Sequence, residues 1–175
     1  MSAAIFFSGK YGSTEQYARW IGEATGLPVF DIKDASADPS KYEYLVLGSS
    51  ILYFKLSIRK WASANLSKLD GRAKILFSVS GEGPSDKLNT WVANSFPPEL
   101  LSQVEHVGLG GRLDHSKLSW LLRKILWVGS LINSDPEASK EERFGFDHVN
   151  KASIEPIVNL IKEYQGSKMP ASQNL

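Results

Sequence analysis

Short apolar runs alternate along the chain with longer stretches in which apolar positions recur at helical spacing. The short runs, rich in β-branched or aromatic residues, predict strands at Ala3–Phe7, Val29–Ile32, Tyr44–Leu47, Ala73–Val79 and Val104–Leu109, of which the first is expected to be buried. The longer stretches predict helices at Thr14–Ala24, Leu56–Leu66, Asp86–Phe96, Leu118–Ile132 and Ile154–Tyr164. Glycine and proline residues such as Gly26, Pro28 and Pro97 separate the elements.

Five strands that alternate with helices predict an α/β fold. Parallel strands joined by right-handed helical crossovers place helices on both faces of the sheet, so we expect a three-layer, doubly wound, five-stranded parallel sheet. No internal repeat or low-complexity block divides the chain. We therefore expect a single domain over residues 1–165 and a flexible C-terminal tail over residues 166–175.

Composition narrows the function classes. With 175 residues and 42% hydrophobic content the chain can bury a substantial core, and its net charge of +1 gives no reason to expect a nucleic-acid partner. The chain has no cysteine, which excludes disulfides, thiol nucleophiles and cysteine-ligated metals. Its three histidines are far apart, so no metal site is expected, and no residue is assigned a catalytic role. The absence of a leader pattern and of a long apolar run predicts a cytoplasmic protein.

Three loops follow predicted strands and are rich in small or hydroxyl residues: Ser8–Thr14, Gly48–Phe54 and Ser80–Ser85. In an open parallel sheet, ligands bind outside the carboxyl ends of the strands. The first loop leads into a helix, where backbone N–H groups and the helix dipole favour a phosphate, although a capped strand–helix turn explains the same residues equally well. Neither the Walker A pattern nor GxGxxG is present, so the loop does not predict hydrolysis of ATP or GTP.

The residues from Ile5 to Glu15 resemble the FMN phosphate loop of flavodoxin-like proteins. Within that family, Gly48–Tyr53 is similar to the Gly-Ala-Ser-Ile-x-Tyr loop of the flavodoxin-type, menaquinone-dependent protoporphyrinogen dehydrogenases. The segment Gly110–Asp114 and the basic, aromatic helix Leu118–Ile132 are similar to the same branch. The resemblance extends over almost the whole chain up to Tyr164 and implies a flavodoxin-like fold with FMN as cofactor.

Carried over position by position, the resemblance implies three groups of cofactor-binding residues. The first loop would hold the phosphate through Ser8, Gly9, Lys10, Tyr11, Gly12, Ser13 and Thr14. The second and third loops would contact the flavin ring through Ser49, Ser50, Ile51, Leu52 and Tyr53, and through Ser80, Gly81, Glu82 and Gly83. Two interpretations of Tyr53 stay open: it covers the flavin ring, or it packs on the next helix at the rim of the site.

Two departures from the family pattern bear on the cofactor. Gly9 and Tyr11 stand where many flavodoxins place hydroxyl groups on the phosphate, which predicts weaker FMN binding unless Ser8 or Lys10 compensates. The third loop lacks the second stacking aromatic of electron-carrier flavodoxins and does not match the protoporphyrinogen branch. Glu82 either brings negative charge near the flavin or is a solvated loop residue.

The predicted helix Leu118–Ile132 carries basic residues together with Trp120 and Trp127. One interpretation is a helix that covers the sheet and whose outer residues meet a dimer partner or a neighbouring loop. The other is contact of both tryptophans with a membrane surface or a partner, which would make the protein peripheral to a membrane. Arg112 and His115 follow the fifth strand and either meet substrate carboxylates or lie on the plain surface.

The favoured interpretation is an FMN-dependent oxidoreductase that oxidises protoporphyrinogen-type tetrapyrroles, as in heme biosynthesis, and passes the electrons to a quinone. Its expected partners are a small-molecule redox substrate or quinone and a second copy of the chain. A flavodoxin-type electron carrier is one alternative, although the near-zero net charge argues against an acidic docking face. An FMN-free interaction domain of the same fold is the other.

Overall fold

A computed structural model describes residues 2–114, 120, 124, 127–128 and 145–166. Its main sheet holds five parallel strands in the order β2 (Val29–Asp31), β1 (Ala3–Ser8), β3 (Tyr44–Leu52), β5 (Ala73–Ser80) and β6 (Glu105–Gly110). The chain leaves β1 to form β2 on one side and then crosses to form β3 on the other, so the strand order reverses at β1 and β3. The predicted doubly wound α/β fold is confirmed.

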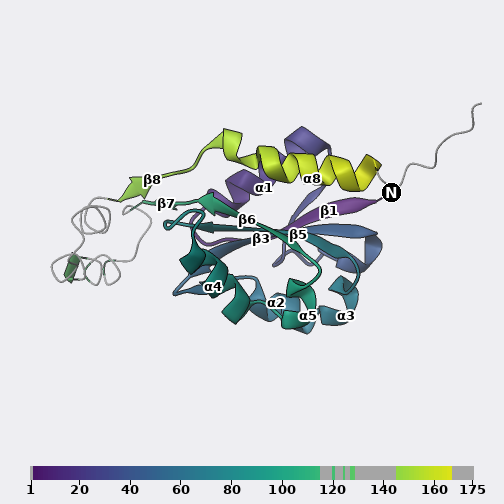
Figure 1. The fold of residues 1–175 in the computed structure, drawn as a ribbon, viewed down its shortest axis with the longest axis horizontal. Coiled ribbons are helices and arrows are strands. Elements are labelled where there is room, and N and C mark those ends of the chain that lie inside the picture. Colours follow the sequence, from purple (N-terminus) through teal and green to yellow (C-terminus); the bar gives the residue numbers. More distant parts are fainter. Residues whose placement is uncertain (1, 115–119, 121–123, 125–126, 129–144, 167–175) are drawn as a thin grey trace, which may run out of the picture.

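Helices cover both faces of the sheet (Figure 1). One face carries α1 (Ser13–Thr25) and α8 (Glu155–Gly166), which contact each other. The opposite face carries α2 (Arg59–Ala64), α3 (Leu66–Leu69), α4 (Asp86–Ser95) and α5 (Pro98–Leu101).

Each face of the sheet has its own apolar core. In β1, Ile5 and Phe7 belong to the core beneath α1 and α8, whereas Ala4 and Phe6 belong to the core of the opposite face. A strand that is buried on both faces has a continuous apolar sequence. Residues 3–7 therefore show no alternation of apolar and polar side chains. The two cores therefore account for the compact runs that predicted the strands.

Most predicted elements agree with the structure to within one or two residues. Helix α1 ends where Gly26 adopts a left-handed conformation and its N–H donates to the Gly22 carbonyl at 2.8 Å. Helix α4 begins after Ser85, whose Oγ accepts a hydrogen bond from the Leu88 N–H at 3.2 Å.

The prediction of a loop over Gly48–Phe54 is wrong for residues 48–52. Strand β3 continues through Leu52 and returns as β4 (Lys55–Leu56), with Ile51 opposite Leu56 in an antiparallel pair. Tyr53 and Phe54 form the two-residue turn with positive φ angles of 50° and 61°. Such turns usually carry asparagine or glycine, so the sequence did not signal this one.

The β3–β4 hairpin also changes the helix predicted over Leu56–Leu66. Because Leu56 pairs with β3, the helix begins only at Arg59, and it breaks at Asn65 into α2 and α3. The side-chain amide of Asn65 donates to the Trp61 carbonyl at 3.0 Å, which ends the first of these helices.

A second, two-stranded antiparallel sheet joins β7 (Arg112–Leu113) to β8 (Phe146–Asp147). Short 3-10 helices lie at Pro39–Lys41 and Lys151–Ile154. His115, most of the predicted helix Leu118–Ile132 and the tail after Gly166 lie outside the described residues. Of that helix, Trp120, Lys124, Trp127 and Val128 are described and exposed. Within the described ranges, no helix is long and apolar enough to cross a bilayer.

Candidate functional site

A cleft of about 150 Å³ lies at the carboxyl edge of the main sheet. Its walls come from the loop after β1, the end of β3, the end of β5 and the β7–β8 sheet. The lining residues are Tyr11, Ser13, Thr14, Ser50, Ile51, Leu52, Val79, Ser80, Gly81, Gly111, Arg112, Leu113 and Phe146. The three loops singled out in the sequence thus meet at one place, because parallel strands all end at the same edge. A pocket that surrounds a drug-sized ligand is usually about 300 Å³ or larger, so this cleft would enclose only part of an FMN-sized molecule.

The loop between β1 and α1 presents the start of the helix to the cleft. Gly12 precedes the helix with a φ of 94°, a left-handed conformation that favours glycine, and no side chain caps the helix. In the described part of the chain, the N–H groups of Ser13, Thr14 and Glu15 have no acceptor. Such a helix start offers several donors and the positive end of the dipole to an anion.

Gly9 is explained by the packing of Thr14. A Cβ at position 9 would lie 2.9 Å from the Thr14 Cβ and 3.2 Å from its Oγ1. Thr14 is buried, and its hydroxyl stands next to the position that a side chain at residue 9 would need. A side chain at position 9 would therefore collide with Thr14, which explains the glycine at this position.

Lys10 and Tyr11 form the outer part of the same loop. The exposed Lys10 places its Nζ 5.4 Å from the centre of the Tyr11 ring, and that ring lines the cleft. Ser8 is the last residue of β1 and is buried. Ser8, Gly9, Lys10 and Gly12 shape this loop without lining the cleft themselves.

A chain of hydroxyl groups joins the β3–β4 hairpin to the end of β1. The Ser50 Oγ donates to the Ser57 Oγ at 3.1 Å, and the Ser57 Oγ donates to the Ser8 carbonyl at 2.8 Å. Ser49 is fully buried, and its Oγ accepts a hydrogen bond from the Ile58 N–H. Ser49 therefore supports the hairpin from beneath, whereas Ser50 lines the cleft. Ser57, which supports both, was not singled out in the sequence.

The tip of the hairpin carries two exposed aromatic residues. Tyr53 is 74% exposed and does not line the cleft. Phe54 packs on Trp91 of α4, with the ring centres 5.1 Å apart. The aromatic contact at the hairpin tip is thus made by Phe54, and both interpretations of Tyr53 stay open.

The end of β5 forms the floor of the cleft. The Ser80 carbonyl accepts hydrogen bonds from the Gly111 N–H at 2.7 Å and the Gly83 N–H at 3.3 Å. The Ser80 Oγ is buried and has no hydrogen-bond partner within the described residues. A buried hydroxyl without a partner costs about 1–3 kcal/mol, so this atom points to a polar group supplied by a ligand.

Glu82 forms an ion pair with Lys87, with 3.0 Å between the Oε1 and Nζ atoms. Neither Glu82 nor Gly83 lines the cleft, and Gly83 has a φ of 62° as part of the turn. The carboxylate therefore brings little uncompensated charge to the site.

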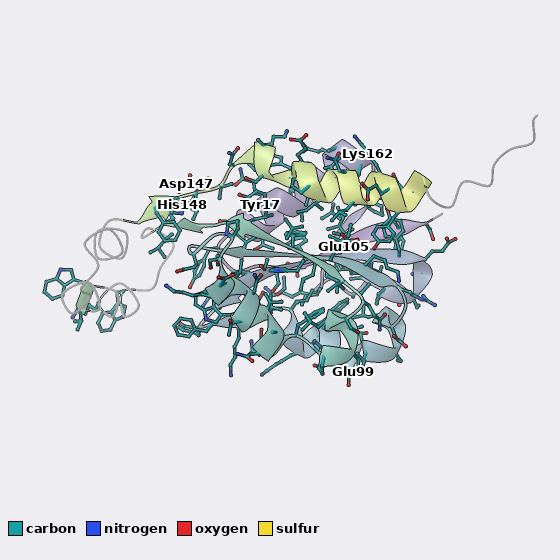
Figure 2. The ribbon with its side chains drawn as sticks, viewed as in Figure 1. Tyr17, Glu99, Glu105, Asp147, His148 and Lys162 are labelled. Carbon is teal, nitrogen blue, oxygen red and sulfur yellow. The ribbon has the colours of Figure 1, made fainter. Side chains whose placement is uncertain are left out.

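The β7–β8 sheet closes the cleft with residues to which the sequence had assigned no function or only an open one. A Cβ on Gly81 would lie 2.4 Å from the Phe146 Cζ, so the glycine makes room for this ring. The Phe146 ring stacks on His148, with the centres 4.8 Å apart. Arg112 pairs with Asp147 through a 2.8 Å contact between Nε and Oδ2. Figure 2 shows Asp147 of β8 and the adjacent His148 at the same end of the molecule.

Hydrogen bonds keep Asp147 ionised in its pair with Arg112. Partial burial raises the pKa of Asp147, but the Val149 N–H and the Arg112 guanidinium together outweigh it and hold that pKa below its usual range.

Tyr17 of α1 anchors the two strands: its OH donates to the Gly110 carbonyl at 2.9 Å and accepts from the Asn150 N–H at 3.0 Å. Burial, the largest effect, raises the pKa of this phenol.

Comparison with known families identifies the domain. The family model described as the flavodoxin domain matches residues 4–140. The chain belongs to the flavodoxin domain family. The match covers all five strands of the main sheet and the three loops at the cleft, and it names no finer branch of the family.

Several solved structures are similar to the chain at low sequence identity. The two-electron reduced flavodoxin of Megasphaera elsdenii is 15% identical with a TM-score of 0.48, over 81% of this chain and 96% of that one. The Trp repressor binding protein of Bacillus subtilis is 13% identical with a TM-score of 0.48, over 81% and 96%. A flavodoxin from the domain Archaea is 17% identical with a TM-score of 0.43, over 82% and 94%. No curated protein matches the sequence.

Proposed function

We propose that the cleft binds FMN and that the protein is an FMN-dependent oxidoreductase. The observation that carries the proposal is the meeting, in one cleft, of an uncapped helix N-terminus with the buried, unpartnered hydroxyl of Ser80. The first suits a phosphate and the second suits a polar atom of a ligand. Membership in the flavodoxin domain family supports the same cofactor.

We assign the phosphate and the ring of FMN to two different parts of the cleft. The phosphate would be held by the N–H groups of Ser13 and Thr14 and by the Thr14 hydroxyl. The ring would lie against the ends of β3 and β5, where Ile51, Leu52 and Phe146 supply apolar surface that excludes water. When bound, FMN supplies one- and two-electron redox chemistry, while the protein binds and orients the cofactor.

We infer a tetrapyrrole of the protoporphyrinogen type as the substrate and a quinone as the electron acceptor. This finer proposal rests on the similarity of Gly48–Tyr53 and Gly110–Asp114 to the protoporphyrinogen dehydrogenase branch. Both segments border or approach the cleft, since Ser50–Leu52 and Gly111–Leu113 line it.

We further propose that the protein acts in the cytoplasm, forms a homodimer and contacts a membrane surface through Trp120 and Trp127. The exposure of these side chains, 63% and 50%, supports a contact with another surface. Lys124 lies 4.9 Å from the Trp120 ring, which places a cation beside the exposed aromatic as expected for a membrane interface.

The first test is an absorbance spectrum of the purified protein before and after FMN is added and the mixture is desalted. Flavin bands that survive desalting support the proposal. A matched pair of variants locates the site, because Gly12 and Gly26 both have positive φ and stand at opposite ends of α1. Both Gly12→Ala and Gly26→Ala should lower stability by about 1–3 kcal/mol, but Gly12→Ala alone should release FMN.

The outcomes separate the alternatives. A colourless protein that retains no FMN would contradict the proposal and leave the FMN-free interaction domain. If FMN is retained, anaerobic mixing with protoporphyrinogen and a quinone tests the activity. Consumption of both supports an oxidoreductase, whereas inertness toward both would leave an electron carrier.

A further inference from the structure

Arg112 has an unusual position in the cleft. Among the described residues that line it, Arg112 is the one with a charged side chain. The others are hydroxyl, aromatic, aliphatic or glycine residues, and Asp147, the partner of Arg112, does not line the cleft. The wall contributed by β7 therefore presents the guanidinium of an ion pair whose carboxylate lies outside the cleft lining.

The arginine is held in place from two directions. The register of β7 and β8 sets Arg112 directly opposite Asp147, and the Asp147 Oδ1 accepts a second hydrogen bond, from the Val149 N–H at 3.1 Å. Tyr17 ties the chain before β7 and after β8 to α1 through Gly110 and Asn150. Figure 2 shows Tyr17 between α1 and the sheet, on the side of the molecule that carries β8. Arg112 is thus oriented before any ligand arrives.

Asp147 uses only one edge of the guanidinium group. Its Oδ2 accepts from the Arg112 Nε at 2.8 Å, and the two terminal nitrogens of Arg112 have no acceptor in the described part of the chain. Their N–H groups form a planar fork that matches the two oxygens of a carboxylate or phosphate. The side chain is 34% exposed, so its attraction for a bound anion is screened less than at a fully exposed site.

We propose that Arg112 is the anion-recognition residue of the cleft and binds a carboxylate or phosphate group of its ligand. The neighbouring Phe146 and Leu113 fit a planar, apolar ligand body beside that anionic group. This inference rests on the proposed function, because it places the anion on a ligand that shares the cleft with the flavin.

The position of Arg112 favours the redox substrate as the source of the anion. Arg112 follows β6, and β6 is separated from β1 by β3 and β5. Three strand spacings, roughly 14 Å, separate β1 from β6 within the sheet. The phosphate of FMN is expected at the start of α1, next to β1, although Tyr17 of α1 reaches the Gly110 carbonyl at the end of β6. We assign Arg112 to a carboxylate on the second ligand, and the comparison of FMN with riboflavin tests the phosphate as the other source.

The experiment compares wild type, Arg112→Gln and a matched control, Arg19→Gln. Arg19 also pairs with a carboxylate, that of Glu15 at 2.7 Å, but it lies outside the cleft. Two ligand pairs differ by one anion: FMN against riboflavin, and anthraquinone-2-carboxylate against its carboxamide. Dissociation constants are measured by calorimetry, first without flavin and then, for the anthraquinones, with FMN present.

Wild type should prefer the carboxylate to the carboxamide, and Arg112→Gln should lose about tenfold to a hundredfold in affinity for the carboxylate alone. Arg19→Gln should keep the wild-type preference between the two anthraquinones, which is the readout it controls, because its partner Glu15 lies in the first turn of α1 beside the expected phosphate. If Arg112→Gln instead weakens FMN but not riboflavin, the recognised anion is the cofactor's phosphate. Absence of an Arg112-dependent preference in both pairs overturns the proposal.

Two further arms keep the result interpretable. Arg112→Lys retains the charge without the planar fork, so it should show an intermediate loss even if the glutamine variant folds poorly. If wild type binds neither FMN nor riboflavin, the proposed function is contradicted. The anthraquinone pair would still test Arg112, because that measurement needs no flavin.

Discussion

Two buried hydroxyl groups, those of Ser80 and Tyr44, have no hydrogen-bond partner within the described residues. Their settings differ, because Ser80 lines the cleft whereas Tyr44 lies in the core beneath α8. Burial raises the pKa of Tyr44 to about 12, so its hydroxyl stays protonated and only costs desolvation. An unpartnered group in the core is a simple packing cost, but one at a cleft can gain a partner when a ligand binds.

We therefore expect Ser80→Ala and Tyr44→Phe to stabilise the flavin-free protein, each by up to about 1–3 kcal/mol, because both remove an unsatisfied buried hydroxyl. Only Ser80→Ala should also weaken FMN binding, by about tenfold. Denaturant unfolding and FMN titration of the two variants measure both effects. Equal FMN affinity in wild type and Ser80→Ala would show that the hydroxyl is not a ligand contact.

Gly9 shows how much of the site could be predicted at the level of single residues. The meeting of the three loops at one edge of the sheet followed from the sequence, since it depends on local chain direction. The steric reason for Gly9 did not, because it depends on the packing of Thr14, whose Cβ would lie 2.9 Å from a Cβ at position 9. A residue-by-residue motif comparison registers only the missing hydroxyl.

The β3–β4 hairpin is the element that changes the picture of the cleft most. It replaces a predicted loop by a short antiparallel pair whose turn forces two bulky residues into positive φ. Non-glycine residues in this region cost about 1–3 kcal/mol, and such strain persists where the surroundings or the function require it. The contact of Phe54 with Trp91 gives a structural reason for the positive φ of Phe54, but none is given for that of Tyr53.

Tyr53→Gly should decide what the other residue does. Relief of the positive φ should stabilise the protein by about 1 kcal/mol. If Tyr53 covers a bound flavin ring, the variant should also bind FMN more weakly and expose the flavin to a quencher such as iodide. Unchanged FMN affinity and quenching would leave Tyr53 as a surface residue. Phe54→Gly is the matched control, since it relieves the same strain but loses the contact with Trp91.

The β7–β8 sheet could not be found from the sequence, for a different reason. Each strand has only two residues, and the paired Arg112 and Asp147 are 35 positions apart. Two residues show no periodicity, so pattern analysis has nothing to detect. The five main strands could be predicted because each is a run of several residues bounded by loop signals, although β2 and β6 are only partly buried. Arg112 and Phe146, in contrast, reach the cleft through long-range pairing alone.

At the scale of the whole molecule, the free energy of unfolding depends on pH through His106 of the main sheet. This residue lies on β6, and its Nε2 is 2.8 Å from the Oγ of the fully buried Ser78 on β5. Burial lowers the pKa of His106, so the folded protein resists protonation that the unfolded chain accepts. The resulting stability is complete above the unfolded pKa of about 6.5 and is lost as the pH falls below it.

Wild type should therefore lose stability as the pH falls below about 6.5, with a slope of at most about 1.4 kcal/mol per pH unit from this histidine. His106→Gln, which cannot be protonated, should flatten this part of the curve. Urea unfolding at closely spaced pH values measures the slopes. Asp38 and Asp147, whose pKa values are lowered, act only below about pH 4. Parallel curves for wild type and His106→Gln would mean that the Ser78–His106 pair does not link the sheet to proton uptake.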